Sequence, residues 1–420
     1  MGFLKSLRCI DCGKEYPLDI IQTTCPECSQ KGLFYGLLDQ VYDYDAIAER
    51  ITKKVLEGRK PGLWKYVEFM PISDESSIIT MGEGGAPLVQ AKNLGADLGM
   101  DNLYVKNEGV NPTFSFKDLP NSLIVSKVHS EGAKVVNLMS DGNNGAAAAA
   151  YCAKAGIENY TFIPHDAVPD KVAQIQMYGG RVIMVKGTTT DAGFLSLDAS
   201  MKYGWANITQ IKVLNPYASE AHKSVSYEIC EELGWRVPDW LITPTASGDS
   251  LGAQWKGYRE FKQLGFIETL PRMVAVQGKG ADPVVQAFRS NKNWYEIESF
   301  DPKTICDGLA AGAIPGAWSL NALRDSKGEA VSVTDDETLE AQRVLAEREG
   351  IFAEPSSAVP IVALRKLLDR GIIKKSDTVV CIITGSGLKG MEVAKRTLKK
   401  PVPIEPTLDA VDELLNTWKS

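Results

Sequence analysis

Lys134-Val-Val-Asn-Leu-Met-Ser140, followed by Asp141-Gly-Asn-Asn-Gly145 and an alanine-rich stretch that ends at Ala155, decides the fold. The first part is apolar and favours a strand, the middle is typical of a turn, and the last favours a helix. Strand, turn and helix in this order are the repeating part of a βαβ unit. The stretch therefore predicts a parallel sheet with helices packed on its faces.

The same pattern recurs along the chain. We expect further strands at 103–106, 160–164, 181–186, 240–245, 273–277 and 378–384, and helices at 169–178 and from about 251. A segment at 44–56 also shows helical apolar spacing. The fold class is therefore α/β, with two doubly wound parallel-sheet domains. We place a small module at 1–35, a large α/β domain at 36–120 and 230–420, and a small α/β domain at 121–229. Loops that follow the strands would meet in a cleft between the domains.

Composition excludes several classes of function. The 420 residues are 44% hydrophobic and 24% charged, as in ordinary globular proteins, and carry a net charge of −7 with a pI near 5.3. An acidic chain without a basic patch gives no support for nucleic acid as a partner. Because no apolar run approaches the roughly 20 residues that span a bilayer, we also expect no membrane partner and a cytoplasmic location.

Four of the eight cysteines form two matched pairs near the N-terminus. Cys9 and Cys12 make one Cys-x-x-Cys knuckle, and Cys25 and Cys28 make another twelve residues later. This spacing is typical of four thiolates around one zinc ion in a zinc-ribbon-like module. We expect a structural Zn²⁺ that lies away from the chemistry. The alternative is a vestigial module that has lost its metal.

Asn111-Pro-Thr-Phe-Ser-Phe-Lys117-Asp118 carries the strongest chemical signal. A lysine at the start of a helix, preceded by aromatic and small residues, can lie desolvated in a cleft. Desolvation favours the neutral amine, which is the form that attacks a carbonyl carbon. Lys117 is therefore a candidate nucleophile, although most lysines in such sequences are solvated surface charges.

From Gly82 to Gly390 the chain resembles the fold-type II pyridoxal-phosphate (PLP) enzymes, and threonine synthases in particular. The resemblance rests on seven motifs in the order that the family shows, and they begin at Gly82, Lys106, Asn111, Ser140, Pro244, Glu354 and Thr384. It implies a PLP-dependent lyase that acts on a small amino acid, assembled as a homodimer. The first candidate reaction converts O-phosphohomoserine and water to threonine and phosphate.

The resemblance also implies roles for residues of this chain. Lys117 matches the lysine that holds the cofactor as a Schiff base. The residues that match the rest of the cofactor site are Phe116, Asn143, Ala246, Ser247, Gly248, Asp249, Ser250 and Thr384. Those expected to bind the substrate are Ser115, Ser140, Asp141, Gly142, Asn144 and Lys212. Taken alone, Asn143 could be a turn residue and Thr384 a strand-end threonine.

The chain departs from the usual threonine synthase pattern around the expected substrate. Phe114 stands where relatives usually have glycine, Asp141 where they have serine or threonine, and Leu119 where they have arginine. Ala218 stands where an arginine commonly grips the substrate's phosphate. We therefore expect O-phosphohomoserine to be a poor substrate unless a lysine, Lys212 or Lys223, replaces that arginine.

Other classes of function stay open at this point. A PLP enzyme that performs β-elimination or β-replacement on a serine-type, threonine-type or O-phospho amino acid needs only the first half of the same machinery. A protein that binds PLP or an amino acid without turnover would keep the same motifs. The glycines after residue 383 also suggest a dinucleotide site, but no second strand with an acidic residue follows them.

Overall fold

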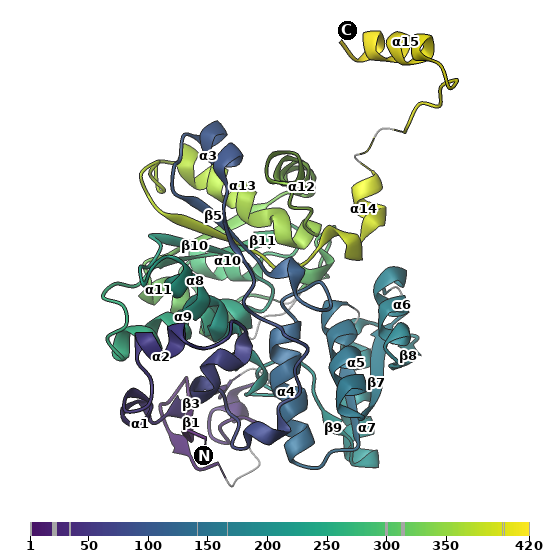
Figure 1. Ribbon diagram of the computed structural model, residues 1–420. Coiled ribbons are helices and arrows are strands. Elements are labelled where there is room, and N and C mark those ends of the chain that lie inside the picture. Colours follow the sequence, from purple (N-terminus) through teal and green to yellow (C-terminus); the bar gives the residue numbers. More distant parts are fainter. Residues whose placement is uncertain are drawn as a thin grey trace.

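The quoted stretch folds as predicted into strand β6 (Val135–Met139) and helix α5 (Asn143–Ala155). The computed structural model describes residues 2–18, 23–32, 35–140, 142–165, 167–298, 301–311, 316–396, 398 and 400–419. Within these ranges the strands form three sheets (Figure 1). Asp141, which the sequence analysis assigns to the substrate site, lies outside the described residues.

The largest sheet has six strands, all parallel except for the edge strand β4. In spatial order the strands are β12 (Glu329–Val333), β11 (Arg272–Gly278), β10 (Trp240–Pro244), β13 (Val379–Ile383), β5 (Leu103–Asn107) and β4 (Leu88–Gln90). Both faces are apolar: Leu241 and Ile382 pack in one buried cluster, whereas the alternate residues Ile242 and Ile383 pack in another. A strand with two apolar faces is typical of a parallel sheet that helices cover on both sides.

Helices cover both faces of this sheet. Those near it are α3 (Lys92–Leu98), α8 (Lys223–Glu232), α9 (Asp249–Gln263), α10 (Pro283–Arg289), α11 (Ala317–Asp325), α12 (Asp335–Glu349) and α13 (Pro355–Asp369) (Figure 1). The aromatic rings of Tyr258 and Phe261 on α9 pack against one face, and Ile361 and Leu364 on α13 pack against the other. The predicted α/β class is confirmed.

The second sheet is fully parallel and has four strands. In spatial order these are β8 (Arg181–Val185), β7 (Glu158–Pro164), β6 and β9 (Ala206–Asn207). Its helices are α5, α6 (Pro169–Met177) and α7 (Thr189–Tyr203), while α4 (Asp118–Ser130) lies between the two parallel sheets (Figure 1). The domain boundaries given above remain a prediction.

The N-terminal sheet is antiparallel and holds the four clustered cysteines. Its strands are β2 (Glu15–Tyr16), β1 (Leu4–Cys9) and β3 (Leu38–Tyr42). Helical spacing at 44–56 predicted one helical segment, but the structure has two short helices, α1 (Tyr44–Ala48) and α2 (Lys53–Glu57). The reason is Thr52, which is extended and caps α2 by accepting a hydrogen bond from the Val55 amide.

The C-terminal part carries two further helices, α14 (Met391–Lys395) and α15 (Leu408–Lys419), and α15 is set apart from the rest of the chain (Figure 1). No strand follows β13 in the described residues. None of the described helices is long and apolar enough to cross a membrane.

Candidate active site

Two segments more than 260 residues apart pair by their backbones and define the site. The Phe116 amide donates to the Thr384 carbonyl at 2.8 Å, and the Ser386 amide donates to the Phe114 carbonyl at 3.0 Å. Ser115 and Gly385 thereby form an antiparallel bridge at the carboxyl end of β13. This link fixes Lys117, the next residue along the chain, beside the central strand of the large sheet.

Lys117 is the residue that precedes α4. Its carbonyl oxygen accepts a hydrogen bond from the Asn121 side chain at 2.7 Å, and its ammonium nitrogen lies 4.9 Å from the centroid of the Phe116 ring. Burial lowers the pKa of Lys117 from 10.5 to about 8, and the negative charge of Asp249 offsets only part of that effect. At neutral pH roughly a tenth of the amine is then uncharged, several hundred times more than for an ordinary lysine.

The turn before Lys117 is held in a strained conformation. Phe114 has a φ of +65°, in the left-handed region that costs an ordinary residue about 1–2 kcal/mol. Thr113 and Asp118 enclose the turn, because the amide and hydroxyl of Thr113 both donate to the Asp118 carboxylate at 2.8 Å. A glycine at residue 114, which the sequence comparison leads one to expect, would adopt this φ freely.

The start of α5 brings together four of the predicted residues. Gly142 precedes the helix, and the Ser140 hydroxyl accepts hydrogen bonds from the amides of Gly142 at 3.3 Å and Gly145 at 2.9 Å. Asn144 is turned toward α4, where its side-chain oxygen accepts from Asn121 at 2.9 Å. The Ser140 hydroxyl is therefore already occupied in capping the helix.

Asn143, the first residue of α5, reaches across to the large sheet. Its amide nitrogen donates to Glu354 at 2.7 Å, and the Glu354 backbone amide donates to the Gly385 carbonyl at 3.0 Å. A Cβ on Gly385 would lie 2.2 Å from a Glu354 carboxylate oxygen, so only glycine fits there. Glu354 also forms an ion pair at 2.9 Å with Lys171 of α6. Asn143 and Thr384 are thus brought to one site.

Thr384 ends the central strand β13. Its hydroxyl shares a hydrogen bond of 2.8 Å with the buried hydroxyl of Ser357 on α13, and either oxygen can be the donor. The Thr384 hydroxyl is therefore oriented by a partner, unlike that of an ordinary strand-end threonine.

Residues 246–250 form the turn from β10 into α9. Gly248 has a φ of +93°, and a Cβ there would lie 2.2 Å from the Cβ of Ser319. The Ala246 carbonyl accepts from Gln277 at 3.0 Å, and the Ser250 hydroxyl accepts from Gln254 at 3.1 Å. The turn is thus rigidly held, and its free amides lie at the start of a 15-residue helix, which favours an anion.

Asp249 is the first residue of α9 and is buried in this turn. One of its carboxylate oxygens accepts from the Lys212 amide at 3.4 Å, and the other has no partner among the described residues. Burial raises the pKa of Asp249, and the positive charges of Lys212 and Lys117 only partly oppose the shift.

The sequence analysis missed His222, Glu354 and Lys171. The imidazole of His222 stacks on Phe116 with ring centroids 4.8 Å apart, and its Nδ1 has no partner among the described residues. Burial, reinforced by the charge of Lys117, holds the pKa of His222 well below its usual value, so the ring is neutral. Glu354 begins one of the seven motifs on which the family resemblance rests, but no neighbouring residue in the sequence indicated its contact with Asn143.

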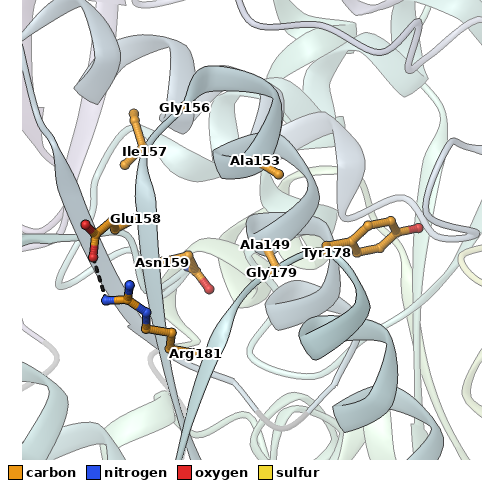
Figure 2. Close-up of a pocket in the computed structure, with 9 residues that line it drawn as sticks. All are labelled: Ala149, Ala153, Gly156, Ile157, Glu158, Asn159, Tyr178, Gly179 and Arg181. Atoms are coloured by element: carbon orange, nitrogen blue, oxygen red, sulfur yellow. Dashed lines mark hydrogen bonds and ion pairs between the residues drawn. The ribbon is translucent and has the colours of Figure 1, made fainter.

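Two hollows lie away from this constellation. One of about 280 Å³ is bordered by α5, β7, α6 and β8 and is edged by the Arg181–Glu158 ion pair (Figure 2). The other, of about 390 Å³, lies beside Asn111 and Pro112 on the segment that leads to Lys117. The first contains none of the predicted site residues, and its ion pair is exposed, so we assign it no role in the chemistry.

The four N-terminal cysteines do come together. Their sulfur atoms all lie within 4.8 Å of one another, and three of the four residues are buried. The Tyr16 hydroxyl lies 3.0 Å from the Cys25 sulfur. Burial alone would raise the pKa of Cys25, but hydrogen bonds from Tyr16 and from backbone amides lower it to about 7. The cluster has the donor set and compactness of a four-thiolate metal site.

A lysine with a lowered pKa, set among the starts of three helices, is the arrangement of an enzyme that binds an aldehyde cofactor with a phosphate group. The sequence pattern of the family described as "Pyridoxal-phosphate dependent enzyme" matches residues 79–385. Threonine synthase of Methanocaldococcus jannaschii is 40% identical over 97% of this chain and 98% of its own length. That of Methanosarcina acetivorans is 38% identical over 97% and 98%. The chain therefore belongs to the threonine synthase family of PLP-dependent enzymes.

Solved structures share the fold at lower identity. Maize serine racemase aligns with a TM-score of 0.63 at 22% identity, covering 80% of this chain and 94% of that one. Tomato (Solanum lycopersicum) threonine deaminase isoform 2 aligns with a TM-score of 0.65 at 20% identity, covering 81% and 96%. The resemblance that the motifs indicated is confirmed, and the dinucleotide alternative is set aside.

The residues present fit PLP. Five of the buried polar atoms that lack a hydrogen-bond partner among the described residues belong to residues next to Lys117 or at the starts of α5 and α9, and they are Ser115 Oγ, Asn143 Oδ1, Lys212 Nζ, His222 Nδ1 and Asp249 Oδ1. Folded proteins rarely leave such atoms unpaired. Donors, acceptors and one cation in the same place suit a polar, anionic cofactor.

The lowered pKa of Lys117 has a measurable consequence. We expect the rate at which the apoprotein captures PLP, trapped with borohydride and located by peptide mapping, to rise with pH, to reach half of its maximum near pH 8 and to level off above that pH. The charge of Asp249 raises the pKa of Lys117, so Asp249→Asn should move the plateau to lower pH. A rate that climbs to pH 10, or a label on Lys389, whose pKa burial also lowers to about 8, would contradict the assignment.

The strain at Phe114 gives a second prediction. Phe114→Gly should have a free energy of unfolding about 1 kcal/mol higher than Phe114→Ala, because both remove the ring but only glycine adopts a φ of +65° freely. At an ordinary position the order is the reverse. Urea denaturation of the two variants measures the difference, and equal stabilities would show that the turn stores no strain.

Proposed function

We propose that the chain catalyses elimination of phosphate from the γ-carbon of a small O-phospho amino acid and addition of water at its β-carbon, with O-phosphohomoserine and water as substrates and threonine and phosphate as products. The observation that carries the proposal is Lys117, which is chemically poised for PLP and is set among the three helix starts. The full-length similarity to proteins named threonine synthase supports the choice of reaction.

The proposed roles around the cofactor follow from the contacts. Lys117 would hold PLP covalently, residues 246–250 would bind its phosphate, and Asn143, Thr384 and Phe116 would orient its ring. When bound, PLP supplies an electron sink that makes the hydrogen on the substrate's α-carbon acidic. The Asn143 amide would need to give up its bond to Glu354, which keeps Lys171 as a second partner.

Lys117 would also move protons. With a pKa near 8, its amine accepts and returns a proton near neutral pH at a small free-energy cost. His222 lies next to it as a neutral ring and cannot act as a second cation. The expected substrate carboxylate would lie at the start of α5, where the helix supplies amides. Ser115, whose hydroxyl has no partner among the described residues, would supply a further donor. The proposed substrate roles of Ser140, Gly142 and Asn144 rest on the same helix start.

The residues available to bind the substrate's phosphate differ from those that the threonine synthase pattern leads us to expect. Ala218 is 2% exposed and offers no polar side chain. Lys223 is committed elsewhere, because its ammonium group donates to the Phe69 carbonyl at 2.8 Å and forms ion pairs with Glu220 and Glu260. The Nζ atom of Lys212 has no hydrogen bond to any described residue. Of the two lysines considered above, only Lys212 can still bind a phosphate.

The lack of a guanidinium at residue 218 favours a second candidate. A PLP enzyme that performs β-elimination or β-replacement on O-phosphoserine would act on a substrate one methylene shorter, whose phosphate lies nearer the cofactor. Such a substrate has less need of a group at residue 218. A protein that binds PLP without turnover is the third alternative, and any steady-state activity excludes it.

Zinc in the four-cysteine cluster, a homodimer and a cytoplasmic location belong to the same proposal. The compact sulfur cluster supports the metal. The dimer follows from the family resemblance alone, and analytical ultracentrifugation of the purified enzyme tests it directly. The cytoplasmic location remains the prediction made from the sequence.

Elemental analysis tests the metal. We expect one zinc per chain in protein purified without chelators, and less than about a tenth of that in Cys25→Ser, because a site with three thiolates has lost one of its charged ligands. Cys306→Ser, which changes a buried cysteine outside the cluster, is the control and should keep the metal. Protein that contains no metal before any substitution would show that the site is vestigial.

Substrate comparison tests the reaction. We expect O-phosphohomoserine to give threonine and phosphate in equal amounts. Its kcat/KM should be roughly 1,000 per molar per second, about two orders of magnitude below that of a typical enzyme. The reason is that a charge-assisted contact to the phosphate is lost at residue 218. The second candidate predicts instead that phosphate is released faster from O-phosphoserine, with pyruvate and ammonia as products in the absence of another nucleophile.

Either pattern supports PLP-dependent phosphate elimination. A kcat/KM for threonine synthesis of roughly 100,000 per molar per second or more lies in the usual range for enzymes. It would show that the loss of activity expected from Ala218 is wrong. Failure to release phosphate from both substrates would contradict the proposed function.

A further inference from the structure

The strand β3 has the cysteine cluster on one side and the candidate active site on the other. Leu38 packs with Cys9, Cys25 and Cys28 in a small buried cluster. The next residue, Asp39, faces the opposite way and forms ion pairs with Lys256 at 2.9 Å and Lys212 at 3.7 Å. Asp39 therefore links the strand that packs on the cysteine cluster to Lys212, a residue predicted to lie in the site.

Lys212 differs from the buried lysines around it. Lys256 and Lys223 each have carboxylate and backbone partners within hydrogen-bond distance. The side chain of Lys212 is 0% exposed, yet its Nζ makes no hydrogen bond within the described part of the chain, and Asp39 is more distant than a normal partner. A buried ammonium group keeps three donors that water cannot satisfy. Such a group is costly unless it serves a further anion.

The position of Lys212 indicates where that anion lies. The Nζ atom lies 3.6 Å from the centroid of the Trp318 ring. That ring packs on Gly252 in the first turn of α9, so closely that a Cβ on Gly252 would come within 2.7 Å of it. The Lys212 amide also donates to Asp249 at the first position of α9. Lys212 and the amides of residues 246–250 therefore face one site.

We propose that Lys212 binds a phosphate monoester dianion at the start of α9, and that Asp39 of β3 is the positioning residue that holds Lys212 there. The cofactor's phosphate is the favoured source, because residues 246–250 surround the same place, and the substrate's phosphate is the other source. This inference rests on the proposed PLP site but not on which amino acid the enzyme uses.

Charge explains why an aspartate is needed. Burial lowers the pKa of Lys212, and the carboxylate of Asp39 is the largest influence that raises it again. Asp39 itself is fully charged, because Lys256 and Lys212 outweigh its own burial and bring its pKa to about 2. Without Asp39 the lysine would lose both its partner and part of its positive charge. Its affinity for a dianion would fall accordingly.

The test measures the affinity of the apoenzyme for two ligands that differ only in the phosphate, PLP and pyridoxal. The variants are Lys212→Met, Asp39→Asn, their double mutant and Asp39→Glu. The matched control is Glu15→Gln, which also changes a carboxylate to an amide in the same sheet, because Glu15 pairs with Arg8 and is separated from Asp39 by the strand β1. Thermal unfolding of each variant shows whether it is folded.

We expect Lys212→Met to weaken PLP binding at least tenfold and Asp39→Asn about three- to tenfold, with pyridoxal binding changed less than twofold. In the double mutant Asp39→Asn should add nothing, because its effect passes through Lys212. Asp39→Glu should keep most of the affinity, and Glu15→Gln all of it. If PLP binding is unchanged but KM for the phosphorylated substrate rises at saturating PLP, the dianion is the substrate's.

Three results would overturn the proposal. Equal losses of PLP and pyridoxal would show general damage to the site. Unchanged PLP affinity together with unchanged KM would show that Lys212 binds neither phosphate. Additive effects of Asp39→Asn and Lys212→Met would remove Asp39 as a positioning residue. The affinities for PLP and pyridoxal can be measured whichever amino acid is the true substrate, so failure of the proposed reaction would not affect them. Only the comparison of KM requires one substrate from which the enzyme releases phosphate.

Discussion

The backbone pairing of residues 114–116 with residues 384–386 is the constraint on which the site depends. It joins the segment before α4 to the end of the central strand β13, and the amide of Glu354 extends it by one more hydrogen bond to Gly385. Because Gly385 has no Cβ, Glu354 can approach closely enough to hold Asn143 on the other sheet. The starts of α4 and α5 and Lys117 are thereby brought together by contacts between residues more than 200 positions apart in the sequence.

Neighbouring carboxylates distinguish the buried lysines of this chain that have a structural role from those that have a functional one. Burial would lower the pKa of Lys106, Lys171 and Lys256, yet adjacent carboxylates outweigh that effect and keep all three charged. Lys117 has only Asp249 to oppose burial, so its pKa falls to about 8. Lys212 lies between these cases, because its ion pair with Asp39 is long, at 3.7 Å, and burial still lowers its pKa. The same side chain thus serves as a fixed charge, a nucleophile or an anion ligand according to the carboxylates around it.

Much of the fold was predictable because its βα units are local. The stretch 134–155 shows its strand, turn and helix in the order of its residues, and the two Cys-x-x-Cys knuckles show their spacing directly. The helix pattern at 44–56 misled because apolar spacing does not reveal that Thr52 caps a second helix. Asp39, His222 and Glu354 could not be predicted, since each acts on a residue more than 100 positions away. Local sequence patterns reveal periodicity and motifs, but they do not reveal which charged residues far apart in the sequence will pair.

The central claim is that the starts of α4, α5 and α9 build one PLP site around Lys117. A crystal structure of the protein with PLP bound tests this most directly. The account predicts continuous density from Lys117 to the cofactor, its phosphate at residues 246–250 within reach of Lys212, and its ring between Asn143 and Thr384. A phosphate bound at the start of another helix, or a cofactor attached to a different lysine, would contradict the claim.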